Sequence, residues 1–171
     1  RDIKRYQPLV GNQFLIFTRR GVEINQYPAI KQYLRRFKKS LTPKPQHWQG
    51  ETWAGRKPGS YQWYEIQDAV DYYQEFEKPK IIYLVFQVKP AFTYDETGTY
   101  GNNATWIIPG KDHYLLGILN SKLGWFLISH YCTQIQNGYQ LIFQYLLRIP
   151  IKRLDFQNPA EKAKHDRIVL L

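Results

Sequence analysis

The stretch from Gly55 to Tyr83 reads GRKPGSYQWYEIQDAVDYYQEFEKPKIIY, and it contains the three kinds of segment from which this chain is built. It opens on a glycine- and proline-rich turn that carries Arg56 and Lys57. Apolar residues then recur at three- and four-residue spacing, which predicts an amphipathic helix over Glu65 to Phe76. Lys80 next introduces an apolar run that is typical of a strand covered on both faces. A turn, a helix and a strand in one short stretch indicate a mixed fold.

The flanking sequence extends this mixture. Asn12 to Phe17 is predicted as a strand, and Pro28 begins an amphipathic helix of about 12 residues. The expectations that follow in the chain are a strand over Ile81 to Val88, a strand–turn–strand unit from Ala91 to Pro109, helices over Asp112 to Leu119 and Lys122 to Tyr131, and a strand from Tyr139 to Ile151. This order, without repeats, predicts one α/β or α+β domain with a mixed sheet and flanking helices.

The C-terminal residues predict the start of a further helix. Asn158 is a favourable cap, Pro159 suits the first helical position, and Glu161 follows in the first turn. We therefore expect one domain over residues 1–157 and the start of a further, C-terminal helix over 158–171. The apolar end IVLL needs a cover, so we expect the tail to dock weakly on the body of the domain, or the chain to self-associate weakly through it at high concentration. Because the chain contains no methionine, it is expected to be a piece of a longer polypeptide.

Composition favours a polyanionic partner. The formal net charge is +10, with 43 % hydrophobic and 16 % aromatic residues, which indicates a folded domain that binds nucleic acid or an anionic membrane surface. The longest apolar stretch, Tyr114 to Cys132, is interrupted by polar residues, so no membrane span is expected. Cys132 is the single cysteine and cannot form an internal disulfide, which favours a reducing, cytoplasmic location.

The sequence lacks the common catalytic motifs. It has no glycine-rich phosphate loop, and its one Asn-Pro pair lies at the predicted helix start, so the Asn-Pro-Pro-aromatic motif of amino-group DNA methyltransferases is missing. The only carboxylate–x–lysine triplet of nuclease type is Asp2-Ile3-Lys4. The four histidines are scattered, and no spacing is typical of a metal site. We expect no catalytic residue, no metal and no cofactor in this chain.

Several blocks occur in an order that resembles the TaqI-like C-terminal specificity domain. This is the target recognition domain of adenine-specific DNA methyltransferases and of fused type II restriction–modification enzymes. The most specific blocks are FTRRG with the YPAIK helix after it, RKPGSYQWYEIQD and EKPKIIY, and the likeness covers nearly the whole chain. One departure is Leu84, where the family often has proline. The resemblance implies an upstream methyltransferase domain that binds S-adenosylmethionine, in some relatives with an endonuclease further upstream.

A recognition domain has to hold DNA phosphates and read base edges in the major groove. Arg56 and Lys57 are the first candidates, on a turn whose glycines let the backbone approach DNA; their replacement by alanine is expected to weaken binding without unfolding the domain. Gln87 suits adenine and Lys89 suits guanine, whereas Trp63 is expected, with its neighbour Tyr64, to anchor the core. The full set of candidate contacts to double-stranded DNA is Arg19, Arg20, Lys31, Arg35, Lys38, Arg56, Lys57, Ser60, Tyr61, Lys80, Gln87 and Lys89.

Charge segregation leads to one more expectation. The five carboxylates between Glu65 and Glu77 cannot face phosphates, because like charges repel, so they are expected to form an acidic back that faces solvent, neighbouring cations or the catalytic domain.

Two alternatives to duplex recognition stay open. An RNA-binding module would use exposed aromatic side chains to stack on unpaired bases, and an interaction domain would present the basic face to an acidic protein.

Overall fold

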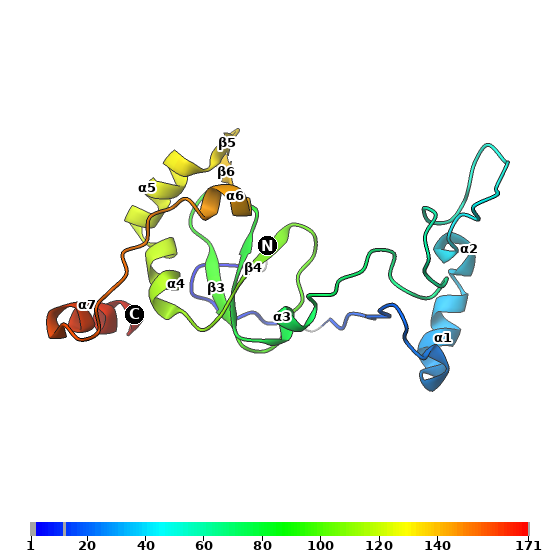
Figure 1. The fold of residues 1–171 in the computed structure, drawn as a ribbon, viewed down its shortest axis with the longest axis horizontal. Coiled ribbons are helices and arrows are strands. Elements are labelled where there is room, and N and C mark those ends of the chain that lie inside the picture. Colours follow the sequence, from blue (N-terminus) through cyan, green and yellow to red (C-terminus); the bar gives the residue numbers. More distant parts are fainter. Residues whose placement is uncertain (1–2, 12, 171) are drawn as a thin grey trace. The chain divides into compact units, whose positions relative to one another are not determined.

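The computed structural model describes residues 3–11 and 13–170. The chain divides into two compact units, Arg1–Asn12 with Tyr72–Leu171, and Gln13–Asp71. We call the first the sheet unit and the second the loop unit (Figure 1). Asp2 of the Asp-Ile-Lys triplet, Asn12 of the predicted first strand and Leu171 of the apolar tail lie outside the described residues.

Two small sheets organise the sheet unit. The first has the order β3-β1-β4 and consists of β1 (Lys80–Leu84), β3 (Phe92–Asp95) and β4 (Thr105–Pro109). The second has the order β2-β6-β5 and consists of β2 (Phe86–Gln87), β5 (Thr133–Ile135) and β6 (Gly138–Gln140). Every pairing is antiparallel, so the mixed α+β class is confirmed but the expected mixed sheet is replaced by two antiparallel ones. Of these paired strands, only the neighbours β5 and β6 are joined by a tight two-residue turn, a connection that is possible between antiparallel strands alone.

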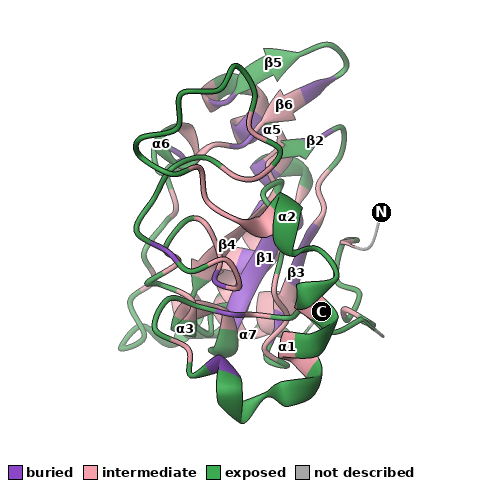
Figure 2. Ribbon diagram, turned by 90° about the vertical axis from the view of Figure 1, so that its right-hand side faces the viewer, coloured by how far each residue is buried: buried purple, intermediate pink, exposed green. Residues whose placement is uncertain are grey.

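The apolar run predicted as one strand over Ile81 to Val88 serves both sheets. It breaks at Val85, whose N–H donates to the carbonyl of Ala104 at 2.9 Å, and whose carbonyl accepts from the N–H of Leu141 at 2.6 Å. The preceding strand β1 is the buried centre of the first sheet (Figure 2). A continuous apolar sequence therefore produces two strands, because its backbone groups change partners at one residue.

Helices α4 (His113–Asn120) and α5 (Lys122–Tyr131) confirm the two predicted between Asp112 and Tyr131. The Asp112 carboxylate accepts from the N–H of Leu115 at 2.7 Å, and the Ser121 hydroxyl accepts from that of Gly124 at 2.9 Å, so both helices start at capped residues. The helices and sheets enclose a core that consists of Ile81, Tyr83, Phe92, Leu116, Leu119, Ile128, Cys132, Leu141 and Ile149.

The last part of the sheet unit differs in part from expectation. The strand predicted over Tyr139 to Ile151 is wrong beyond β6, because the chain turns into the short helix α6 (Phe143–Leu146). Helix α7 (Pro159–Val169) confirms the predicted helix start, with the Asn158 side chain accepting from the N–H of Ala160 at 3.0 Å.

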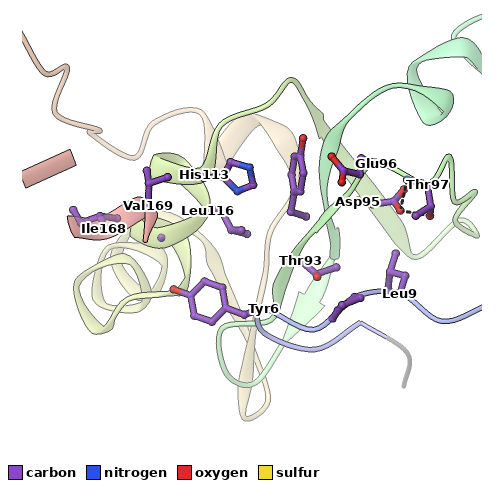
Figure 3. Close-up of a pocket in the computed structure, with 13 residues that line it drawn as sticks. Tyr6, Leu9, Thr93, Asp95, Glu96, Thr97, His113, Leu116, Ile168 and Val169 are labelled. Atoms are coloured by element: carbon purple, nitrogen blue, oxygen red, sulfur yellow. Dashed lines mark hydrogen bonds between the residues drawn. The ribbon is translucent and has the colours of Figure 1, made fainter. Parts of the chain in front are cut away.

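Helix α7 packs on the body of the sheet unit through α4. A Cβ added to Gly117 of α4 would lie 2.5 Å from Cγ2 of Ile168, so the glycine permits the close approach of the two helices. Ile168 and Val169 also line a hollow beside α4 and β3 (Figure 3). Ile168 and Val169 of the apolar tail are therefore partly covered by the body of the domain, whereas Leu170 is 85 % exposed, and self-association stays a prediction.

The loop unit contains little regular structure. Its elements are the 3-10 turn η1 (Ile24–Gln26), α1 (Pro28–Arg35) and α2 (Lys38–Leu41). The helix start at Pro28 is confirmed, but a break after Arg35 divides the single helix expected there. The strand expected up to Phe17 is wrong for its described residues 13–17, which form no strand and leave the Phe14 side chain 99 % exposed. An apolar run without a strand to pair with does not become a strand.

The helix predicted over Glu65 to Phe76 is also wrong for most of its length, because only α3 (Gln74–Glu77) forms, in the sheet unit. Backbone groups at its predicted start are bound by other segments instead. The N–H of Ile66 donates to the carbonyl of Thr18 at 2.8 Å, and the carbonyl of Glu65 accepts from the Arg56 guanidinium at 2.7 Å. Among the described residues, no helix is both long and apolar enough to cross a membrane.

Candidate nucleic-acid interface

Arg56 holds the loop unit together. Its Nε donates to the carbonyl of Leu41 at 2.6 Å and its Nη1 to that of Glu65 at 2.7 Å, while Nη2 donates to those of Trp63 at 3.0 Å and Gln62 at 3.3 Å. The guanidinium thus joins the end of α2 to the segment 62–65, and it is only partly exposed. The expectation that this turn cation contributes little to the fold is wrong, because all of these contacts are structural.

The turn glycine beside Arg56 also has a structural role. A Cβ added to Gly55 would lie 2.1 Å from the carbonyl oxygen of Thr42, so the glycine allows the turn to lie against the residue that follows α2. The N–H of Arg56 donates to the same carbonyl at 3.0 Å. The close backbone approach expected here toward DNA is used within the protein.

Tyr61 and Glu65 are two of the buried residues of the loop unit. The Tyr61 side chain is 5 % exposed, with the guanidinium carbons of Arg56 and Arg20 at 4.6 and 5.7 Å from its ring centroid. The Glu65 carboxylate is buried and accepts from the N–H groups of Gly21 at 2.7 Å and Gln62 at 2.8 Å. Tyr61 is therefore a packing residue in this structure, and Glu65 does not face solvent as expected.

The remaining carboxylates of the expected acidic back are divided between the two units. Asp68 and Asp71 belong to the loop unit, whereas Glu75 and Glu77 lie on α3 of the sheet unit. Glu75 pairs with Lys78 at 2.5 Å. Because the predicted helix does not form, no single helical face carries these groups, and an acidic back on one helix is not what the structure shows.

Lys57 is the exposed cation of the turn. Its Nζ lies 2.8 Å from the carboxylate of Asp68, and both side chains are mostly exposed. The hydrogen bond from Lys57, with a second from Gln67, holds the pKa of the Asp68 carboxyl below its usual value. Ser60 is exposed as well. An exposed ion pair of this kind stabilises little, so Lys57 can exchange its carboxylate partner for a phosphate.

A carboxylate-free run of the loop unit provides most of its positive surface. Residues 24–50 carry six cations and no Asp or Glu, and we call these six side chains the basic segment: Lys31, Arg35, Arg36, Lys38, Lys39 and Lys44. Arg35 and Lys38 are exposed, and Nζ of Lys38 lies 5.5 Å from the ring centroid of Trp63. Lys31 is half-buried and donates to Oδ1 of Asn25 at 2.5 Å. A segment that carries several exposed cations and no carboxylate of its own suits a polyanion.

The aromatic pair behind this surface fits the expected anchoring role. Trp63 and Tyr64 are both half-buried, and their rings meet edge to face with centroids 5.5 Å apart.

The two arginines of the FTRRG block are exposed, and Nη2 of Arg20 donates to the carbonyl of Gln67 at 2.8 Å. Arg19 and Arg20 therefore stay candidates for phosphate contact.

Two of the three candidates in the sheet unit are buried. The Lys80 side chain is fully buried, with Nζ 2.5 Å from Oδ2 of Asp95 and a further hydrogen bond to the Phe76 carbonyl. Burial alone would raise the pKa of the Asp95 carboxyl, but hydrogen bonds from Lys80 and Thr97 outweigh it, and the pKa is lowered. In this structure Lys80 is a core residue that is inaccessible to DNA.

Gln87 is the second buried candidate, at 4 % exposure. Its side-chain oxygen accepts from the N–H of Ala91 at 2.8 Å, and its amide nitrogen donates to the carbonyl of Leu84 at 3.2 Å. These bonds hold the connection between β2 and β3, so the side chain is not presented to base edges. Lys89, in the same connection, is exposed and stays a candidate.

The hollow beside β3 does not suit nucleic acid. Figure 3 shows Asp95 and Glu96 on one side of it and the aliphatic side chains of Leu116 and Ile168 on another. The exposed Glu96 carboxylate would repel phosphates, and the charge of Asp95 is already paired with that of Lys80. Among the described residues, no group of His, Cys, Asp and Glu side chains could hold a metal ion.

The comparison with protein families gives a match that covers most of the chain. The family model of the TaqI-like C-terminal specificity domain matches residues 1–151, which include both sheets, α1 to α6 and the whole loop unit, and which end before α7. The blocks that suggested the resemblance, among them FTRRG and RKPGSYQWYEIQD, lie within the match. A specificity domain of this kind has a DNA-recognition role in restriction–modification enzymes. On this match, and with a mixed α+β fold that carries an exposed basic segment, the chain belongs to the TaqI-like C-terminal specificity domain family.

Proposed function

We propose that this chain is the sequence-specific duplex-DNA recognition domain of an adenine-specific DNA methyltransferase, and that it is not catalytic by itself. The observation that carries the proposal is the family match over residues 1–151. The basic segment, four of whose six side chains are exposed, supports it, because duplex binding depends on cations that neutralise phosphates.

Burial and internal hydrogen bonds narrow the proposed set of contact residues. Tyr61, Lys80 and Gln87 are buried and Arg56 is bound by backbone carbonyls, so these four residues leave the set. The residues that remain exposed, or partly exposed in the case of Lys31, are Arg19, Arg20, Lys31, Arg35, Lys38, Lys57, Ser60 and Lys89.

In the proposed mechanism these side chains bind phosphates and release condensed counterions, which supplies affinity without sequence preference. The Arg56 hydrogen bonds keep the loop unit rigid, so that its cations are positioned before DNA arrives. Polar side chains elsewhere on the domain distinguish the bases.

The chemical step belongs to a linked methyltransferase domain. That domain would bind S-adenosylmethionine and receive the flipped adenine, while the present chain fixes which adenine is presented. A restriction endonuclease in the same polypeptide is compatible with this role, because both activities would share one recognition domain.

Binding by the purified chain tests the proposal. Fluorescence anisotropy would compare a labelled duplex with single-stranded DNA and single-stranded RNA of the same sequence, at several salt concentrations. We expect the duplex to bind most tightly, with an affinity that falls steeply as salt rises. Tighter binding to the single-stranded RNA would favour an RNA-binding module, and failure to bind any duplex at low salt would favour an acidic protein as the partner.

A further inference from the structure

The two-stranded ribbon Thr133–Gln140 is a part of the sheet unit that carries no charged residue. Its strands β5 and β6 pair antiparallel with Gln134 opposite Tyr139, and Gln136-Asn137 form the turn between them. Strand β5 is at the edge of its sheet and all three of its residues are exposed (Figure 2). The ribbon therefore presents one strand and its turn to solvent.

The chemistry of this surface is unusual for the chain. Charged residues make up 22 % of the sequence, yet residues 123–147 contain no Lys, Arg, Asp or Glu. Natural proteins commonly protect an exposed edge strand with charges, and this edge has none. In their place it carries exposed uncharged donors and acceptors: Thr133, Gln134, Gln136 and Asn137. Such groups are suited to hydrogen-bond readout and contribute little to phosphate attraction.

The ribbon is fixed on the body of the sheet unit. The Tyr139 ring meets Trp125 of α5 edge to face, with centroids 5.4 Å apart. A Cβ added to Gly138 would lie 2.5 Å from the carbonyl oxygen of Gln87, so β6 lies tightly against β2. Two side-chain hydrogen bonds lower the pKa of the Tyr145 hydroxyl, and the bond with Thr133 has a larger effect than the bond with Gln144. These contacts hold the ribbon in place, which reduces the entropy lost when its amides bind a partner.

The residue at the turn adds an independent observation. Gln136 has φ 51°, in the left-handed region that non-glycine residues rarely adopt. A two-residue hairpin turn with positive φ at its first central position favours glycine there. The glutamine therefore occupies a position where glycine would relieve backbone strain, and strained residues of this kind cluster at functional sites.

We propose that the ribbon Thr133–Gln140 enters the major groove and reads base edges, with adenine as the base preferred by its amide side chains. The inference rests on the proposed duplex-recognition function and deepens it. The major groove admits a two-stranded β-ribbon, and Asn or Gln pairs in bidentate fashion with N6 and N7 of adenine. The ribbon accordingly supplies discrimination between sequences, while the basic segment supplies affinity.

Two substitutions test the ribbon without endangering the fold. Gln136→Gly removes one amide and relieves the positive φ, so its melting temperature should stay the same or rise. Gln134→Ala removes a second amide from the exposed edge strand. The matched control is Gln74→Ala, an exposed glutamine on α3 outside the ribbon.

The measurement is competition binding between the sequence that the wild-type chain selects from a random duplex pool and the same duplex with single base changes. Each ribbon variant should lose about 5- to 150-fold of its discrimination at one base pair, with an unchanged salt dependence, whereas Gln74→Ala should retain it. Retention of full discrimination by both ribbon variants would overturn the ribbon proposal and leave duplex recognition standing. If the wild-type chain selects no sequence at all, both proposals fail.

Discussion

Replacing Arg56 by alanine should unfold the loop unit. The substitution removes a charged donor from four backbone carbonyls, at distances between 2.6 and 3.3 Å. A hydrogen bond with a charged partner is worth about 1.5–3 kcal/mol, but water can replace part of this because the guanidinium is only partly buried. Counting about 1 kcal/mol for each bond gives a loss of about 4 kcal/mol in the free energy of unfolding. A small unit with so little regular structure has a stability of the same order.

Two further variants separate the structural role from the charge. Arg56→Lys keeps the positive charge, but one ammonium group cannot bind all the carbonyls that the planar guanidinium reaches from three nitrogens. This variant should therefore recover only a fraction of the unfolding free energy that Arg56→Ala loses. Lys57→Ala removes a cation from the same turn and loses only an exposed ion pair with Asp68, so its loop unit should stay folded.

Hydrogen–deuterium exchange resolves the two units separately. Arg56→Ala should lose protection within residues 13–71, while the amides of β1 and β3 in the sheet unit keep theirs. Fluorescence offers a second readout, because Trp48, Trp53 and Trp63 belong to the loop unit. If Arg56→Ala keeps full protection and loses only DNA affinity, the guanidinium contacts phosphate, and the reasoning from its carbonyl contacts is refuted.

Three further predictions concern the basic segment, the buried ion pair and the C-terminal helix. Joint replacement of Lys31, Arg35 and Lys38 by alanine should lower the slope of log affinity against log salt by about one unit for each phosphate that is no longer neutralised. The melting temperature should not change. An unchanged slope in anisotropy titrations would remove these residues from the interface. Asp95→Asn should cost about 3–5 kcal/mol in denaturant unfolding by leaving Lys80 buried without its counter-charge. Because the pKa of Asp95 is lowered by folding, the pair stabilises the wild type above about pH 4, and that contribution should disappear as pH falls through the folded-state pKa; equal acid sensitivity of the wild type and Asp95→Asn would contradict this. Truncation after Gln157 should lower the melting temperature because Ile168 no longer packs on Gly117, while the sheet unit stays folded and duplex affinity is kept; loss of folding would place α7 in the core.

The parts of the fold that follow from sequence are those fixed by local signals. Helices α4, α5 and α7 each begin at a capping side chain that is visible in the sequence, namely Asp112, Ser121 and Asn158. The strands β3 and β4 likewise coincide with short runs of β-branched and aromatic residues.

The errors occur where tertiary contacts override such patterns. Residues 65–73 have helical spacing, but the Glu65 side chain binds backbone N–H groups and Arg56 binds its carbonyl, which leaves the local backbone unavailable for a helix. The run predicted as one strand breaks at Val85 because its backbone joins two sheets. Hydrophobic periodicity indicates neither these side-chain bonds to the backbone at Glu65 nor the distant strand partners of Val85, Ala104 and Leu141.

The candidate interface divides in the same way. Its positive charge and the lack of carboxylates near α1 are visible in the sequence and correspond to an exposed surface. The burial of Lys80 depends on Asp95, which lies opposite it on the neighbouring strand, so composition alone cannot tell this lysine from an exposed one. The Asn137-Gly138 dipeptide is a hairpin signal in the sequence, but it would place the turn one residue later than the structure does, where Gln136-Asn137 form the turn and Gly138 begins β6.

The most direct test of duplex recognition is selection from a pool of randomised duplexes by the purified chain, with sequencing after each round. Sequence-specific recognition predicts that the bound pool converges on one short motif, and that its enrichment persists at a salt concentration that removes nonspecific binding. A bound pool that stays random at every salt concentration would contradict sequence recognition by this chain.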